Sequence, residues 1–202
     1  MATGFIYLAS ASPRRSELLC QIGVPFRVRA ADVPEDERPG EDPAAYVERI
    51  AVAKAEAVWS QVREHDPAPV LAADTTVAIG HEIFGKPANE DAALAMLERL
   101  SGRSHRVLTG VALRWRDLCE AFVAISEVRF RPTTAAERLA YCRCGEPRDK
   151  AGSYAIQGQG AVFVEHLSGS YSSVMGLPLA ETAALLGRFG LPLWLHGEEA
   201  RA

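Results

Sequence analysis

A single carboxylate, Asp74, lies inside an apolar run at residues 70–79. The residues around it are mostly small or β-branched, which predicts a buried strand. An ionised carboxylate that leaves water keeps its charge only if a cation or several hydrogen bonds compensate it. Asp74 is therefore predicted either to be a metal ligand or base in a site, or to cap a turn with its own side chain.

Anion-binding chemistry is indicated near the beginning of the chain, where residues 5–9 read as a short buried strand. Ser12 and Pro13 then predict a helix start, because a serine hydroxyl caps free backbone amides and proline fits the first helical position. A strand that runs into a helix amino terminus offers amides to an anion, and Arg14 and Arg15 add positive charge. The alternative is a solvated basic first turn, which would oppose the helix dipole.

Two further charged features lie between these segments. Residues 32–37 form an acidic loop, which either is solvated or holds a divalent cation. A long helix is predicted to begin after Asp42 and to continue to Val58. Lys54 falls on the apolar face of that helix, where it either extends toward water or reaches a bound anion.

A second lysine is expected near the lone carboxylate. Residues 80–82 predict a tight hairpin turn, which would return the chain alongside the strand at 70–79. Lys86 would then lie near Asp74. His105 is expected to be a loop or strand-end residue, because no partner histidine lies at a metal-chelating spacing.

A glycine-rich stretch at residues 149–160 carries Lys150 and Gln157. Its glycines allow a ligand to approach the backbone closely, and the two side chains supply a charge and an amide. The stretch is only a weak phosphate-loop signal, because it lacks the usual strand, glycine and helix fingerprint. Gln157 either reads a ligand or only satisfies the backbone of a glycine turn.

These side chains must be positioned by alternating helices and strands, which predict an α/β domain with a long, twisted, mixed sheet. We expect helices around the sheet in two lobes, with a central cleft between the lobes and antiparallel strands from residues 108–130 in the middle of the sheet. The expected strands are residues 5–9, 26–30, 70–79, 106–113, 120–130 and 161–167, and the expected helices are residues 13–22, 43–58, 89–100, 133–144 and 177–189, with turns at 115–117 and 169–171.

Length and composition favour a soluble enzyme-sized domain. The 202 residues suit a single domain with a core from about 5 to 190, or two small lobes that share a core. A net charge of −4 disfavours broad binding of nucleic acid, so any phosphate binding must be local. The four cysteines show no disulfide framework, and neither a signal peptide nor a membrane span is visible, which predicts a cytoplasmic protein.

Taken together and in order, seven segments resemble the Maf family of nucleoside triphosphate pyrophosphatases, which are related in fold to inosine triphosphatases. The resemblance runs from about Tyr7 to Phe189. It implies cleavage between the α- and β-phosphates of a nucleotide, with a divalent metal, Mg²⁺ or Mn²⁺. The segments are residues 10–15, 54–55, 73–75, 85–87, 109–111, 149–158 and 169–171.

The resemblance also implies roles for individual residues. Asp74 matches the catalytic carboxylate, and Asp74 and Glu35 would hold the metal. Ser173 stands where relatives often carry asparagine. The positions expected around the triphosphate and metal are Ser12, Arg15, Glu35, Lys54, Lys86 and Lys150.

Three positions point to a branch of the family. Arg14, Thr75 and Gln157 match the branch that acts on dTTP and UTP, whereas the 7-methyl-GTP branch has tryptophan, glutamine and glutamate there. The Gln157 amide could pair with O4 and N3–H of thymine or uracil. Modified pyrimidine triphosphates are further possible substrates, and the family suggests a homodimer.

Two alternatives remain open. The first is a nucleotide-binding regulator of septum formation or cell division that needs no turnover, a role with which the family is associated. The second is a 7-methyl-GTP pyrophosphatase. Loss of Asp74 would leave a regulator working, but an enzyme would still bind nucleotide and no longer release pyrophosphate.

Overall fold

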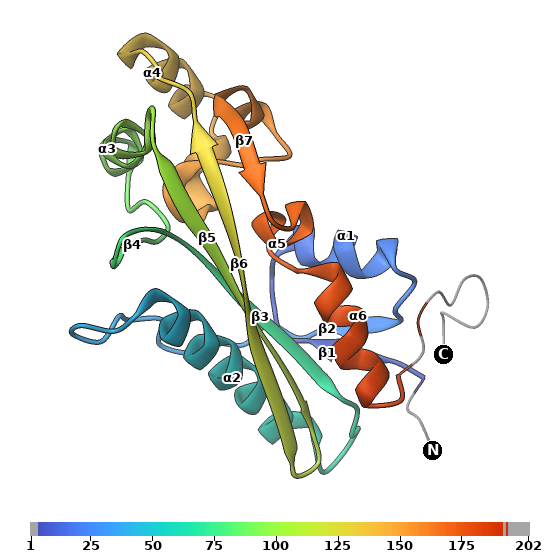
Figure 1. Cartoon of the computed structure of the whole chain (residues 1–202). Coiled ribbons are helices and arrows are strands. Elements are labelled where there is room, and N and C mark those ends of the chain that lie inside the picture. The colour runs from blue at the N-terminus through green and yellow to red at the C-terminus, as the bar shows by residue number, and fades with distance from the viewer. Residues whose placement is uncertain (1–3, 192, 194–202) are drawn as a thin grey trace. The chain divides into compact units, whose positions relative to one another are not determined.

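The computed structural model describes residues 4–191 and 193 (Figure 1). The two ends of the predicted 1–202 domain therefore lie outside the described residues. The strands are β1 (Ile6–Leu8), β2 (Phe26–Val28), β3 (Val70–Ile79), β4 (Glu82–Phe84), β5 (Ser104–Trp115), β6 (Leu118–Phe130) and β7 (Val164–Ser168). The helices are α1 (Pro13–Gln21), α2 (Pro43–Val62), α3 (Glu90–Leu100), α4 (Ala135–Arg143), α5 (Tyr171–Met175) and α6 (Leu179–Arg188), with 3₁₀ turns η1 (Glu146–Asp149), η2 (Ala151–Ser153) and η3 (Gln159–Phe163).

The strands form one mixed sheet in the order β2-β1-β3-β5-β6-β7, with β4 paired to β3. β1 runs parallel to β2 and β3, whereas β4 is antiparallel to β3 and β7 is antiparallel to β6. The predicted mixed α/β sheet is thus confirmed, with β5 and β6 inside it. The hairpin turn at Gly80 is also confirmed, because Ile79 pairs with Glu82.

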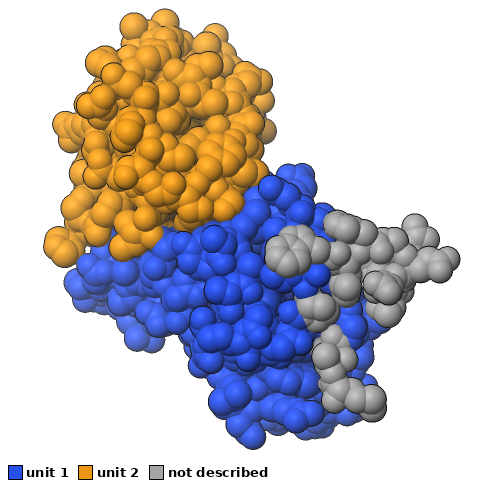
Figure 2. All heavy atoms as spheres, turned by 45° about the vertical axis from the view of Figure 1, so that its right-hand side comes forward, with its two compact units in different colours: residues 1–74, 109–124, 176–202 blue, residues 75–108, 125–175 orange. Residues whose placement is uncertain are grey.

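The chain divides into two compact units, which Figure 2 colours separately. Unit 1 comprises Met1–Asp74, Thr109–Ala124 and Gly176–Ala202, and unit 2 comprises Thr75–Leu108 and Ile125–Met175. The boundary falls within β3, directly after Asp74. The cleft expected between two lobes stays a prediction.

Three local predictions were wrong. Residues 161–163 belong to the 3₁₀ turn η3 rather than to a strand, because the Ala161 amide bonds to the Gly158 carbonyl three residues earlier. The predicted turn at 169–171 is interrupted, since Tyr171 begins α5. The Ser12 side chain does not cap α1, although Ser12 occupies the capping position with Pro13 next.

Unit 1 is built on α2, whose apolar face packs against the sheet. Asp42 caps this helix by accepting a hydrogen bond from the Ala44 amide at 2.9 Å. The buried cluster contains Ala51, Ala55 and Val58 of α2 together with residues of β1, β3 and β5. The helix approaches β5 so closely at Gly110 that a side chain there has no room.

Substituting Gly110 by alanine should therefore destabilise the protein strongly. The new Cβ would lie 2.4 Å from the Val47 carbonyl oxygen and 2.8 Å from the Glu48 nitrogen, both backbone atoms that cannot rotate away. We expect a loss of about 3 kcal/mol in the free energy of unfolding, measured by urea denaturation. Gly187→Ala is the matched control, because nothing lies within 4 Å of its Cβ in α6. It should be neutral or gain about 0.5–1 kcal/mol.

Unit 2 has its own apolar core, which α3 and α4 cover. His105 is buried in the aromatic part of this core, where its ring packs edge-on against Phe130 and Tyr154. Its Nε2 and the Tyr154 hydroxyl form a hydrogen bond of 2.9 Å. His105 is the second residue of β5, which agrees with the expected strand-end position.

Acidification should destabilise the protein through His105. Burial lowers the pKa of His105 from its ordinary value of 6.5 to about 4. A backbone hydrogen bond with Arg103 opposes this shift. The unfolded chain therefore takes up a proton first, and stability is lost as pH falls from about 6.5 toward about 4. This residue should account for about 2 kcal/mol between pH 7.5 and pH 5. Urea denaturation of wild type and His105→Gln at both pH values checks this, because the variant should lack that part of the loss.

The sheet ends at β2, which pairs with β1 alone among the described strands. Val28 in β2 is 55% exposed, and arginines flank it. Arg27 pairs with Asp66 at 2.9 Å, and Arg29 donates to the Gln61 side chain at 2.8 Å.

Candidate functional site

A buried cluster of opposite charges lies in unit 1 around Lys54. The Lys54 ammonium contacts Asp74 Oδ1 at 2.8 Å and Glu35 Oε1 at 2.5 Å. Lys54 is only 8% exposed and Asp74 only 7%, whereas the Glu35 side chain is more accessible. The ammonium therefore compensates the lone carboxylate of β3, and the predicted position of Lys54 on the apolar face of α2 is confirmed.

Helix α2 also holds the acidic loop that carries Glu35. The Tyr46 hydroxyl donates to the Glu35 carbonyl at 2.9 Å. One turn further, Arg49 donates to the Asp36 carbonyl at 3.1 Å and binds the Glu41 carboxylate with two nitrogens, each at 2.6 Å. The loop is thus fastened to the helix that supplies Lys54, which keeps the Glu35 side chain beside the ammonium.

The negative potential of this cluster acts on Tyr46. Burial raises the pKa of the Tyr46 hydroxyl, and the charges of Asp74, Glu35 and Glu37 raise it further. Tyr46 therefore remains a hydrogen-bond donor to the loop throughout the neutral range. Its role is to hold Glu35 in place.

Arg15 is buried at the start of α1 in the same unit. Its Nε donates to the Gly176 carbonyl at 2.8 Å, and its Nη1 donates to Ser10 Oγ at 3.0 Å. Burial lowers the pKa of Arg15, and the negative charges of Asp74 and Glu35 oppose this lowering. The guanidinium is therefore fixed in a position from which it acts electrostatically on both carboxylates.

The remaining predicted residues of unit 1 lie close along the chain to Arg15. The Ser12 amide donates to Ser10 Oγ at 3.2 Å, so one hydroxyl organises the turn that leads into α1. Ser12 and Arg14 are both partly exposed. The turn thus presents the amino terminus of α1 as expected, but Ser10 rather than Ser12 orders it.

Unit 2 contains the other four predicted residues, Thr75, Lys86, Lys150 and Gln157. Thr75 follows Asp74 in β3 and is partly exposed, and Lys86 and Gln157 are exposed. The segments that carry the two lysines are joined, because the Gly152 amide donates to the Gly85 carbonyl at 3.1 Å. Whether the two groups of residues line one cleft, including Lys86 beside Asp74, stays a prediction.

Lys150 is held within its own loop. Its ammonium donates to the Glu146 carbonyl and to Asp149 Oδ1, both at 2.7 Å, and its side chain is largely buried. These contacts direct a single positive charge to one place. Such a charge suits a phosphate group, which lysine binds as a point charge.

The two carboxylates around Lys54 supply the kind of donor that a hard divalent cation prefers. Mg²⁺ is usually bound by one or two carboxylates together with substrate phosphates rather than by a complete protein cage. Among the described residues, no group of three or more His, Cys, Asp or Glu side chains could form such a cage. Glu35 and Asp74 therefore fit the smaller kind of metal site.

Sequence reasoning missed several residues that build these sites. Tyr46 is one of them, although a buried tyrosine hydroxyl normally finds a hydrogen-bond partner. That general rule was the available signal. The sequence contains no comparable signal for Ser10 or Arg49, because their hydrogen-bond partners come together only when the loops fold.

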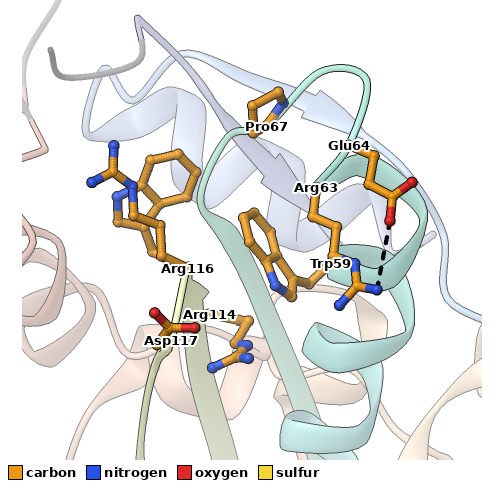
Figure 3. Close-up of a pocket in the computed structure, with 8 residues that line it drawn as sticks. Trp59, Arg63, Glu64, Pro67, Arg114, Arg116 and Asp117 are labelled. Carbon is orange, nitrogen blue, oxygen red and sulfur yellow. Dashed lines mark ion pairs between the residues drawn. The ribbon is translucent and has the colours of Figure 1, made fainter.

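A pocket of about 490 Å³ opens in another part of unit 1, and none of the predicted site residues lines it (Figure 3). The rings of Trp59 and Trp115 pack edge to face there, with their centroids 5.5 Å apart. Arg63 and Glu64 form an exposed ion pair of 3.6 Å at its rim. Its lining contains Trp59, Arg63, Glu64, Pro67, Arg114, Trp115, Arg116 and Asp117. The pocket lacks the buried carboxylate and ammonium that distinguish the Lys54 cluster.

Within the part of the chain that the structure describes, no helix is long and apolar enough to cross a bilayer. Cys20, Cys119, Cys142 and Cys144 are all free thiols.

Comparisons with known proteins agree on one family. The Maf-like protein model matches residues 5–189 of this chain. A dTTP/UTP pyrophosphatase of Myxococcus xanthus (strain DK1622) is 54% identical over 188 residues, which cover 93% of this chain and 94% of that protein. The dTTP/UTP pyrophosphatase of Pseudoalteromonas atlantica (strain T6c / ATCC BAA-1087) is 50% identical over 187 residues, which cover 92% and 97%.

Among solved structures, a nucleoside-triphosphatase / dITP/XTP pyrophosphatase from Mycobacterium abscessus aligns with a TM-score of 0.42 and 17% identity. The alignment covers 92% of this chain and 96% of that one.

Proposed function

The chain belongs to the Maf-like family, and from this membership we propose that it is a nucleoside triphosphate pyrophosphatase that hydrolyses dTTP and UTP. The products are the nucleoside monophosphate and pyrophosphate. The observation that carries the proposal is the buried Lys54 cluster in a chain 50–54% identical to dTTP/UTP pyrophosphatases over nearly their whole length.

We assign the hydrolysis to the cluster in unit 1. Asp74 would orient the attacking water and accept its proton, because it is a buried carboxylate held in one orientation by Lys54. Lys54 and Arg15 would stabilise the negative charge that develops on the phosphate oxygens. Both cations are fixed before substrate arrives, so little reorganisation is needed during the reaction.

A divalent cation, Mg²⁺ or Mn²⁺, would be held by Glu35 and Asp74 together with the phosphates. When bound, such a cation neutralises phosphate charge and helps the pyrophosphate to leave. The tether of Tyr46 and Arg49 supports this assignment, because it holds the backbone of the Glu35 loop independently of the carboxylate itself.

We assign binding of the substrate's phosphates and base to the remaining predicted residues. Ser12 at the start of α1 and the lysines Lys86 and Lys150 would bind phosphate oxygens. Gln157 would pair with O4 and N3–H of the pyrimidine, and Arg14 and Thr75 would contribute to the same selectivity.

The base assignment has a direct test in Gln157→Glu. A glutamate accepts but does not donate, so it should lose the pairing with O4 and favour the donor edge of guanine. We expect the ratio of kcat/KM for UTP to that for GTP to fall by about tenfold, the effect of one neutral hydrogen bond in a binding site. An unchanged ratio would remove Gln157 from the recognition of the base.

The function itself is tested by pyrophosphate release from a panel of canonical and modified nucleoside triphosphates. The panel should include dTTP, UTP, 5-methyl-UTP, GTP and 7-methyl-GTP, each with Mg²⁺, with Mn²⁺ and without metal. We expect turnover of dTTP and UTP that requires the metal. Turnover of 7-methyl-GTP alone would favour the other branch, and tight nucleotide binding without any turnover would favour the regulator.

The same family membership supports a cytoplasmic homodimer that acts on free nucleotides rather than on nucleic acid or at a membrane. The net charge of −4 agrees with local rather than extended phosphate binding. Light scattering of the purified chain gives the oligomeric state.

A further inference from the structure

One carboxylate in unit 2, Glu146, lies at the centre of the hydrogen bonds that hold the glycine-rich loop. Glu146 Oε2 accepts from the Gln159 amide at 3.0 Å, and Oε1 accepts from the Gly160 amide at 3.1 Å. The Tyr141 hydroxyl donates to Oε1 at 2.6 Å. The carboxylate thus fixes the backbone directly after Gln157.

The Tyr141 hydroxyl extends this support to the other side of Gln157. It accepts a hydrogen bond from the Ala155 amide at 3.1 Å while it donates to Glu146. Backbone amides on both sides of Gln157 are therefore tied to one carboxylate and its phenol partner. Gln157 itself is exposed, so its side chain is presented by the loop and not by packing of its own.

The carboxylate is held in its charged form. Burial alone would raise the pKa of Glu146, but hydrogen bonds from Tyr141, Gly160 and Gln159 and the charge of Lys150 together lower it below its ordinary value. Hydrogen bonds to a charged acceptor are stronger than those between neutral groups. Glu146 therefore holds the loop throughout the neutral range.

The glycines of the loop make room for this carboxylate. A Cβ on Gly158 would lie 2.1 Å from Glu146 Oε2, and a Cβ on Gly160 would lie 2.7 Å from the Tyr141 hydroxyl. Any side chain at Gly158 would force the carboxylate away. The glycine at 158 thus leaves room for the Glu146 carboxylate, and the glycine at 160 leaves room for the Tyr141 hydroxyl.

The backbone of Glu146 also holds Lys150, because its carbonyl accepts from the Lys150 ammonium at 2.7 Å. One residue therefore positions two groups: Lys150 through its carbonyl and the Gln157 loop through its side chain. Lys150 and the loop that carries Gln157 are thus both attached to Glu146.

We propose that Glu146 is a positioning residue for substrate selection, which holds the Gln157 loop in the arrangement that reads a pyrimidine triphosphate. This inference rests on the proposed function of Gln157 in base recognition. Glu146 does not touch the substrate. Its removal should therefore weaken the recognition of UTP and dTTP while the chemistry at Asp74 proceeds at nearly its usual rate.

The experiment compares wild type with Glu146→Gln and Gly158→Ala. Glutamine keeps the shape, but its NH₂ group faces one of the donors that the carboxylate accepted. Alanine at 158 displaces the carboxylate without changing it. Glu165→Gln is the matched control, because Glu165 forms an exposed ion pair with Arg129 in the same unit and does not touch the loop.

Two readouts are needed. Without nucleotide, hydrogen exchange of the Gln159 and Gly160 amides should accelerate about tenfold or more in both variants, the effect expected from the loss of a charge-assisted hydrogen bond. With nucleotide, KM for UTP and dTTP should rise about tenfold while kcat changes less than threefold, and the weaker turnover of GTP should stay unchanged. Glu165→Gln should match wild type in both readouts.

The outcomes separate this inference from the proposed function. If wild type releases no pyrophosphate from any triphosphate, the proposed function fails and this inference falls with it. If wild type turns over UTP and the amides exchange faster in the variants, but KM for UTP stays within twofold, Glu146 serves the fold alone and the inference is overturned. If Glu146→Gln does not fold, Tyr141→Phe removes the hydrogen bond to Glu146 and the one from the Ala155 amide. It should raise KM for UTP about threefold, and an unchanged KM would again overturn the inference.

Discussion

Asp74→Asn should lower kcat for dTTP and UTP by about a thousandfold, the scale of a positioned general base. The carboxylate is buried in β3, and Lys54 donates a hydrogen bond to its Oδ1. The second oxygen, Oδ2, is therefore held in a defined orientation. An amide keeps the shape and an acceptor for Lys54, but it cannot take a proton from water. The fold and nucleotide binding should therefore persist while pyrophosphate release is lost.

The measurement is pyrophosphate release together with calorimetric binding of UTP. Asp66→Asn is a matched control in unit 1, because Asp66 accepts from Tyr7 and Arg27 away from the cluster. That control should keep wild-type kcat. An Asp74→Asn enzyme that retains more than about a tenth of wild-type kcat would be incompatible with Asp74 as the general base.

Lys54→Met should reduce both stability and activity. Methionine fills the space of the lysine stem but leaves Asp74 buried beside Glu35 without the ammonium that contacts both. Removing one partner of a buried ion pair costs about 3 kcal/mol in the free energy of unfolding. The loss of a charge-assisted phosphate contact should also lower kcat/KM for UTP by about tenfold to a hundredfold.

Urea denaturation at pH 7.5 measures the loss of stability in Lys54→Met. Arg27→Met breaks the exposed pair with Asp66 instead, and it should cost less than about 1 kcal/mol. Equal stability of Lys54→Met and wild type at pH 7.5 would show that Lys54 does not compensate Asp74.

Much of the fold could be predicted because local patterns and long-range packing agree. The run at 70–79 is buried on both sides, and the sequence therefore identified β3 and its unusual carboxylate. Helix α2 combines a capping aspartate with apolar residues at helical spacing, which also placed Lys54 on the inner face. Thr134 and Glu137 lie three residues apart and form the capping box that begins α4, where a helix was expected.

The features that could not be predicted involve residues whose partners lie far away in the chain. Arg15 is held by Ser10 and by the Gly176 carbonyl, which lies 161 residues away, and no spacing rule connects them. Similarly, the residues at 155–160 adopt their turns around the Glu146 carboxylate. Their composition of glycine and small residues did not define that conformation, and a strand was therefore predicted to begin too early, at residue 161.

Arg27 of β2 and Arg29 directly after it have a consequence for behaviour at high concentration. A strand at the end of a sheet offers unsatisfied backbone groups to a strand of another molecule, and an exposed apolar residue such as Val28 would favour such stacking into aggregates. Arg27 and Arg29 flank Val28 with exposed charged side chains, which hinder the pairing of this edge with a strand of a second copy. Charged side chains of this kind are a common protection of exposed sheet edges against aggregation.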